Sequence, residues 1–224
     1  MRIIFVRHGD PDYARDCLTD KGRRQAELAA ERLEGEGIGQ IWSSPQGRAM
    51  QTAQAASARL GIAPVRVLDC MHEICWGSAD GTPAVAGGNP WNIADQLVRE
   101  GWDLTRADWR EHPYFRANLA APEADKVARG IDAWLEGLGC RREGLYYRCL
   151  SPESAEATVA LFGHGGSSAA AMAHILNLPF PYLCGTLRLP FTGITVLRIG
   201  RKPGQPAMPV VELASDGRHL GGEA

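Results

Sequence analysis

The residues of this chain best suited to chemistry follow its short apolar segments. Arg7 and His8 come directly after Met1–Val6, whose β-branched and aromatic residues are typical of a buried parallel strand. In open α/β sheets, ligands bind at the carboxyl ends of the strands. A guanidinium and an imidazole at that edge could bind phosphate and move a proton. By itself the pair fits a solvated loop equally well.

Three further segments place polar residues after an apolar run. They are Ser43–Ala53 after Ile41-Trp42, His72–Gly77 after Val65–Leu68, and Phe162–Gly166 after Thr158–Leu161. Carboxyl ends of parallel strands meet at one edge of a sheet, so these residues are expected to gather beside Arg7 and His8. The pattern therefore predicts a site that binds phosphate or transfers protons.

Taken together, these segments resemble the histidine phosphatase superfamily, the phosphoglycerate-mutase-like proteins. The matching motifs are Arg7-His8-Gly9, Leu18-Thr19-x-x-Gly22-x-x-Gln25-Ala26, Ser43-Ser44-Pro45 with Arg48, and Gly163-His164-Gly165-Gly166. They span most of the chain in the family's order, which makes the set far more specific than Arg-His-Gly alone. The resemblance implies that the histidine at the position of His8 accepts a phosphoryl group, with its other ring nitrogen bonded to the Gly9 carbonyl.

Length and composition predict one domain over residues 1–224. Hydrophobic residues make up 45% of the 224, the net charge is −2, and no basic face suggests nucleic-acid binding. No run approaches the roughly 18 apolar residues of a membrane span, and the first apolar run is too short for a signal peptide. Without Cys-x-x-Cys pairs or an export signal, all cysteines are expected to be reduced and the protein cytoplasmic. The cysteines are Cys17, Cys70, Cys75, Cys140, Cys149 and Cys184.

The apolar periodicity predicts an α/β fold, a three-layer sandwich with a mostly parallel central sheet, helices on both faces and an inserted lid. Thr19 is expected to cap a helix that ends near Leu33, before a strand over 38–42. Ser44 is expected to cap the next helix, with Pro45 in its first turn. Arg48 would then lie within that turn, close to the strand end.

Residues 77–122 break the pattern and are interpreted as the lid or specificity insertion. Glycine and proline are frequent there, yet its aromatic residues favour order over disorder, and short helices are one form that order could take. Their ordinary packing onto the body explains them equally well. The later elements expected are a helix over 122–138, strands over 144–150 and 157–162, a helix over 166–176, and antiparallel edge strands over 192–197 and 209–213.

The residue types suit transfer of a phosphoryl group. Arg7 and Arg48 have planar forks that match phosphate oxygens, and His164 could donate a third hydrogen bond. The amide of Gly165, at a helix start, could donate a fourth. The two arginines disfavour a charged imidazolium, so His8 is expected to be neutral and nucleophilic.

The departing alkoxide needs a proton, and Glu73 is the candidate acid. The resemblance supports it, since family members carry a glutamate shortly before a glycine in a loop after the third strand. His72 and Asp80 are nearby competitors, and a solvated loop carboxylate is the alternative interpretation of Glu73. Burial beside apolar residues would raise the pKa of the acid and keep it protonated near neutrality.

The remaining histidines are interpreted as structural. His112 precedes a proline, His174 lies in an apolar helix, and His219 is expected to contact Asp216. Neither His-x-His nor His-Glu-x-x-His nor paired cysteines occur, so neither a catalytic metal nor another cofactor is predicted. Activity should therefore survive chelation.

The predicted function is hydrolysis of a small phosphorylated metabolite through a phosphohistidine. One alternative is an enzyme of another class, a serine esterase, but this chain lacks the Gly-x-Ser-x-Gly elbow that such enzymes need. Another is a protein that binds phosphate esters without turning them over. The alternative within the family is a mutase. Asp10-Pro11-Asp12-Tyr13 stands where family mutases carry a small polar and Trp-Asn pattern, and its carboxylates would repel a second anion if they faced the pocket. The sequence predicts neither the substrate nor the oligomeric state.

Overall fold

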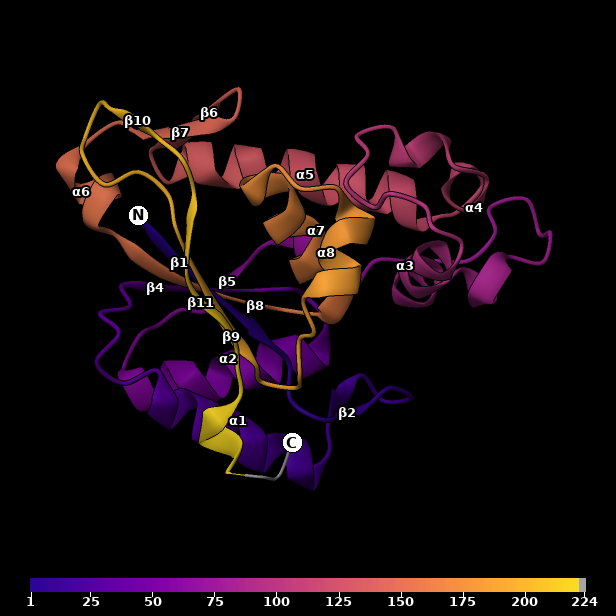
Figure 1. The fold of residues 1–224 in the computed structure, drawn as a ribbon. Coiled ribbons are helices and arrows are strands. Elements are labelled where there is room, and N and C mark those ends of the chain that lie inside the picture. The colour runs from indigo at the N-terminus through magenta and orange to yellow at the C-terminus, as the bar shows by residue number, and fades with distance from the viewer. Residues whose placement is uncertain (222–224) are drawn as a thin grey trace.

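A six-stranded sheet organises the chain, and the computed structural model describes residues 1–221 (Figure 1). The strands, in spatial order, are β11 (Val210–Asp216), β9 (Ile194–Arg198), β1 (Arg2–Arg7), β8 (Thr158–Gly163), β4 (Gln40–Ser43) and β5 (Arg66–Val67). The last four run parallel to one another, while β9 and β11 are antiparallel. The mostly parallel sheet with an antiparallel edge is thus confirmed.

Side chains of β1 alternate between two separate cores. Ile4 and Val6 pack on the side covered by α1 (Asp20–Arg32) and α2 (Gly47–Leu60). Ile3 and Phe5 pack on the opposite side. Figure 1 shows that side covered by α5 (Ala120–Gly137), α7 (Gly165–Leu176) and α8 (Phe180–Thr186). Burial of both faces explains why the strand reads as one continuous apolar run.

Thr19 begins α1 as predicted, because its hydroxyl accepts a hydrogen bond from the Gly22 amide at 3.0 Å. The prediction that Ser44 caps the next helix, with Pro45 in its first turn, is wrong. Helix α2 begins at Gly47 after an N-cap at Gln46, two residues beyond Ser44. The Ser44 hydroxyl instead contacts His164 Nε2 at 2.8 Å, so a residue expected to begin a helix supports the candidate site.

Residues 77–122 contain short helices, as expected. These are η2 (Val85–Gly88), α3 (Pro90–Arg99), η3 (Trp109–Glu111) and α4 (Pro113–Arg116). The Asn89 side chain caps α3 by accepting from two backbone amides. Ile93 and Leu97 of α3, together with buried Trp109 and Phe115, join the core beneath α5, α7 and α8. Several of the segment's aromatics are therefore ordinary packing residues.

The remaining elements are short. The hairpin of β2 (Pro11–Asp12) and β3 (Cys17–Leu18) follows β1, and η1 (Asp69–Met71) follows β5. A small sheet combines β6 (Cys140–Glu143), β7 (Tyr146–Cys149) and β10 (Pro206–Ala207). Two short helices complete the list, α6 (Pro152–Glu156) and η4 (Arg218–Leu220). None of the helices in residues 1–221 has the length and apolarity needed to cross a membrane.

A disulfide joins Cys140 and Cys149, so the expectation that every cysteine is reduced is wrong. These residues stand opposite each other in the antiparallel β6–β7 pair, with Cα atoms 4.1 Å apart. The strand over 140–143 was missing from the prediction, and without it their cross-strand pairing could not be seen. The other four cysteines are free.

Candidate active site

Strands β1 and β8 bring two histidines together. Arg7 pairs with Gly163 in the parallel ladder, so His8 and His164 are the next residues on neighbouring strands. Their ring centroids lie 5.1 Å apart, and both side chains are buried. The predicted meeting of these residues at one sheet edge is therefore what the topology produces.

His8 presents one unprotonated ring nitrogen toward Arg48. Its Nδ1 lies 2.7 Å from the Gly9 carbonyl oxygen, which can only accept, so Nδ1 carries the proton. The lone pair then resides on Nε2, which lies 3.4 Å from Nε of Arg48. Burial, together with Arg7 and Arg48, lowers the pKa of His8 to about 3. The imidazole is thus neutral over the whole physiological range.

His164 and Arg7 each hold a buried polar atom without a hydrogen-bond partner among residues 1–221. These atoms are Nδ1 of His164 and Nε of Arg7. Ser44 can donate to Nε2 of His164, which places the proton on Nδ1 and makes that atom a donor. Burial, followed by the nearby His8, lowers the pKa of His164 to about 2. Because buried polar groups are normally paired, both atoms call for a ligand acceptor such as a phosphate oxygen.

Arg48 lies in the first turn of α2, and its side chain is only 7% exposed. One end of its guanidinium contacts Asp16, with Nη1 and Oδ1 2.5 Å apart. Asp16 lies in the turn between β2 and β3, and sequence reasoning missed it. Its only sequence signal is a carboxylate within ten residues of His8, which many surface loops share.

Glu73 is fixed against the start of α7. Its Oε1 accepts backbone N–H groups from Ile74 at 3.0 Å, Gly166 at 2.9 Å and Ser167 at 3.0 Å. Burial raises the pKa of this carboxyl, and the three N–H groups oppose that shift. A β-carbon on Gly166 would lie 2.7 Å from Oε1 and 2.4 Å from Ile74 Cγ1, so only glycine permits this contact.

The competing acids are not placed for the reaction. His72 is exposed, and Asp80 is exposed in a loop where the Ser78 and Thr82 hydroxyls lower its pKa to about 2. Neither residue lines the cavity beside Arg7, whereas Glu73 does. Geometry thus favours Glu73 among the three.

A cavity of about 590 Å³ is lined by Arg7, Glu73 and Gly165 of the predicted site, whereas His8, Arg48 and His164 are not among its lining residues. Its other lining residues are Tyr13, Trp76, Asn89, Trp91, Arg188, Leu189, Pro190 and Ser215. Trp76 and Trp91 meet edge to face with centroids 6.2 Å apart. The Trp91 ring lies beside Gly165, whose added β-carbon would be 3.7 Å away. Residues 77–122 therefore supply one wall of the cavity, next to the start of α7.

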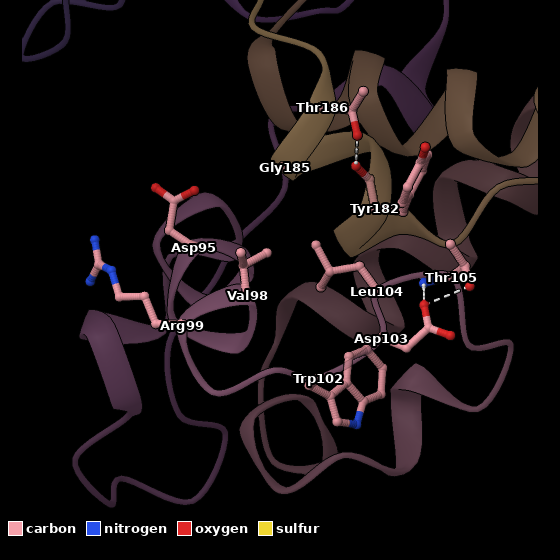
Figure 2. A pocket seen from close by; sticks show the side chains of 10 residues that line it. All are labelled: Asp95, Val98, Arg99, Trp102, Asp103, Leu104, Thr105, Tyr182, Gly185 and Thr186. Atoms are coloured by element: carbon pink, nitrogen blue, oxygen red, sulfur yellow. Dashed lines mark hydrogen bonds between the residues drawn. The ribbon is translucent and has the colours of Figure 1, made fainter.

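A second cavity, of about 600 Å³, lies between α3, the loop that follows it and α8 (Figure 2). None of the predicted site residues lines it. Its Asp95 carboxylate lies 3.5 Å from the guanidinium of Arg188, a residue that lines the first cavity. One exposed ion pair thus joins a lining residue of the first cavity to a lining residue of the second.

The other histidines have structural contacts. His112 Nδ1 accepts from the Tyr114 amide at 3.2 Å and caps α4, and His174 Nε2 lies 2.9 Å from Asp132. The expected contact between His219 and Asp216 is not a hydrogen bond. His219 Nε2 pairs with the Thr192 hydroxyl at 3.0 Å, while Asp216 binds Arg218. Across residues 1–221, no group of three or more His, Cys, Asp or Glu side chains could hold a metal ion.

Comparison with known proteins gives a consistent picture. A curated relative, the 2,3-bisphosphoglycerate-dependent phosphoglycerate mutase of Thermoplasma acidophilum, is 32% identical over 155 residues, which cover 59% of this chain and 76% of the relative. The phosphoserine phosphatase of Entamoeba histolytica, solved with 3-phosphoglyceric acid, superimposes with a TM-score of 0.62 at 21% identity, covering 98% of each chain. A mycobacterial glucosyl-3-phosphoglycerate phosphatase complexed with VO3 also gives 0.62, at 24% identity, covering 96% of this chain and 99% of that one.

The two solved structures share the fold of this chain. Because both are less than 25% identical to it, the likeness shows the fold alone. The family model of the histidine phosphatase superfamily (branch 1) matches residues 3–208. This match includes both histidines, both arginines and Glu73, which the fold gathers at one edge of the sheet. The chain therefore belongs to the histidine phosphatase superfamily, whose members are phosphoryl-transfer enzymes.

Proposed function

We propose that this protein hydrolyses a phosphomonoester of a small metabolite through a phosphohistidine on His8. The observation that carries the proposal is the neutral Nε2 of His8 beside three cationic or donor groups. Arg48 faces that nitrogen at 3.4 Å, and the unpartnered atoms of Arg7 and His164 lie on the same edge of the sheet. Phosphoryl transfer depends mainly on such positioning and charge stabilisation.

In the first step, the substrate phosphate is held by Arg7, Arg48, His164 Nδ1 and the N–H of Gly165. The lone pair of His8 Nε2 attacks phosphorus, and the bond from phosphorus to the ester oxygen breaks. The departing oxygen takes a proton from Glu73. Because Oε1 of Glu73 accepts three backbone N–H groups, that proton is carried on Oε2.

In the second step, water attacks the phosphohistidine. Glu73, now a carboxylate, accepts a proton from this water as the phosphorus–nitrogen bond breaks. Inorganic phosphate leaves and Nε2 regains its lone pair, while Nδ1 keeps its proton on the Gly9 carbonyl throughout. No metal ion enters this scheme, because the arginines and histidine supply the positive charge and the donors.

A mutase is the second candidate, and the 32% identical Thermoplasma relative favours it. The repulsion expected from Asp10 and Asp12 finds no support. Asp10 accepts from the Thr19 hydroxyl at 2.6 Å, Asp12 caps the turn after β2, and neither lines the cavity. The carboxylates of Asp10 and Asp12 therefore give no reason to exclude a mutase substrate.

A different feature favours hydrolysis. A mutase substrate carries a second anionic group that needs its own cation. Apart from Arg7, the one arginine that lines the cavity in the described chain is Arg188, and Asp95 lies 3.5 Å from it. That carboxylate offsets the charge of Arg188.

The proposed location is the cytoplasm. The expectation rested partly on all cysteines being reduced, and the Cys140–Cys149 disulfide removes that part of its support.

The two candidates are separated by measuring phosphate release and isomerisation on the same preparation. The substrates are phosphorylated sugars, nucleotides, phosphoserine and 3-phosphoglycerate, the last with and without a bisphosphoglycerate. A phosphatase releases inorganic phosphate from at least one of them. Interconversion of 2- and 3-phosphoglycerate that outpaces phosphate release would identify a mutase instead. Absence of both activities, with His8 unmodified, would support a binding protein.

A further inference from the structure

Asp16 lies next to the phosphate-binding arginine without belonging to any of the motifs. Its Oδ1 contacts Nη1 of Arg48 at 2.5 Å, and its Oδ2 accepts from the Gly47 amide at 2.7 Å. One carboxylate therefore holds both the side chain of Arg48 and the backbone just before it. Asp16 has a φ of +49°, in the left-handed region that aspartate adopts more readily than most residues.

The approach of this turn depends on a missing side chain. A β-carbon on Gly47 would lie 2.1 Å from the Asp16 carbonyl oxygen and 3.4 Å from its Oδ2. Glycine at the first position of α2 therefore lets the β2–β3 turn lie against the start of the helix. A general surface loop would not need such close contact.

The contact determines which edge of Arg48 remains for a ligand. Nη1 donates to Asp16, and Nε donates a long hydrogen bond of 3.4 Å to Nε2 of His8. Nη2 makes no hydrogen bond to any residue in 1–221. Once Nε exchanges its hydrogen bond to His8 for a phosphate oxygen, the Nε–Nη2 edge can bind two oxygens of a phosphoryl group, in the bidentate geometry that arginine offers.

We propose that Asp16 is the positioning residue of the phosphate clamp, keeping the Nε–Nη2 edge of Arg48 directed at the phosphoryl group on its way to His8. This inference rests on the proposed phosphate-binding role of Arg48. Asp16 stays on Nη1 before and after substrate binds and does not compete for the edge that the phosphate takes.

The opposing effect is repulsion between Asp16 and the phosphate. The Asp16 side chain is 42% exposed, so water and salt screen its charge. Arg48 is 7% exposed, and its other orienting contacts are the 3.4 Å hydrogen bond to His8 and the Tyr13 ring 5.4 Å away, both weaker than the ion pair with Asp16. Loss of orientation should therefore outweigh loss of repulsion. A charge-assisted hydrogen bond of this kind corresponds to about a tenfold change or more in an equilibrium constant.

The matched substitutions are Asp16→Asn and Asp12→Asn. Both lie in the same hairpin and remove one negative charge, but Asp12 bonds only to the amides of Ala14 and Arg15 and to the Arg15 side chain. Titration calorimetry with inorganic phosphate needs no turnover, so it tests Asp16 even in a protein that proves not to be a phosphatase. We expect Asp16→Asn to bind phosphate about tenfold more weakly, and Asp12→Asn to bind like the wild type or slightly more tightly.

A double-substitution cycle with Arg48→Ala tests whether Asp16 acts through Arg48, with kcat/KM for nitrophenyl phosphate as the readout. Asp16→Asn should lower this value in the wild-type background and leave it unchanged once Arg48 is absent. Two results would overturn the inference: equal or tighter phosphate binding by folded Asp16→Asn, or additive losses in the cycle. Thermal unfolding of each variant establishes that the comparison is between folded proteins.

Discussion

Nε of Arg48 lies 3.4 Å from Nε2 of His8, the ring nitrogen that the Gly9 carbonyl leaves free. This relationship places a positive charge where it helps to keep the histidine unprotonated, and where the proposed mechanism needs a cation for the phosphate. Burial and the two arginines lower the pKa of His8 to about 3, so this imidazole would need no deprotonation step to act as the proposed nucleophile near neutrality. Its two ring nitrogens thus have separate tasks, one fixed by the backbone and one directed at the ligand.

Glu73→Gln should separate acid catalysis from positioning. Glutamine keeps a carbonyl oxygen for the N–H groups of Ile74, Gly166 and Ser167 but carries no transferable proton. Hydrolysis of alkyl phosphates should fall by about 10²–10⁴, the usual contribution of general acid catalysis. A nitrophenyl ester, whose leaving group needs little protonation, should lose much less. Equal losses on both esters would show that Glu73 positions the site and does not protonate.

Gly166→Ala should displace the same carboxylate indirectly. The new β-carbon would lie 2.4 Å from Ile74 Cγ1 and 2.7 Å from Glu73 Oε1, so Glu73 must move. We expect a destabilisation of about 1–3 kcal/mol by overpacking. The loss should again be larger on alkyl than on nitrophenyl esters. These quantities are measured by denaturant unfolding and by steady-state kinetics.

Gly137→Ala is the control for this substitution. Gly137 ends α5, and a β-carbon there meets nothing within 4 Å. Alanine should leave the leaving-group ratio unchanged and stabilise the helix slightly. A Gly166→Ala protein with wild-type stability and the wild-type ratio would contradict the contact between Gly166 and Glu73.

The buried histidines should make the protein sensitive to acid. The pKa values of His8 and His164 fall from 6.5 to about 3 and about 2 on folding. Between pH 6.5 and pH 3 the unfolded chain therefore binds protons that the folded chain does not, and stability falls as pH falls. Each pKa unit corresponds to about 1.4 kcal/mol, so one histidine should cost about 2–3 kcal/mol by pH 4.5.

His164→Asn tests this linkage, because asparagine can still bond to Ser44 and does not titrate. The difference in Tm between pH 7 and pH 4.5 should be smaller in this variant than in the wild type. Identical pH dependence in the wild type and His164→Asn would contradict the burial of a neutral imidazole.

The sequence predicted the elements whose pattern is local. The apolar run of β1, the Thr19 cap and the helical repeat of α5 all lie where the residues indicated. The motifs also predicted that His8 and His164 meet at one edge of the sheet, because the carboxyl ends of parallel strands lie there. These features follow from periodicity, capping and topology.

The differences arise where contacts distant in sequence decide the outcome. Ser44 has the chemistry of a helix cap, yet its hydroxyl bonds to His164, 120 residues away. Asp16 reaches Arg48 only because Gly47 permits a close approach. Cys140 and Cys149 form a disulfide through a cross-strand pairing that no single segment reveals. Such contacts follow from the assembled fold and carry no periodic signature.

The most direct test of the central claim is to quench the protein during turnover of a ³²P-labelled phosphomonoester and examine it for bound phosphate. The proposed mechanism predicts label that is lost in acid and stable in base, mapping to the peptide that contains His8. Replacement of His8 by Ala should abolish the label and the activity while the protein remains folded. Label of the same amount on His8→Ala, or turnover by that variant at the wild-type rate, would assign the nucleophile elsewhere.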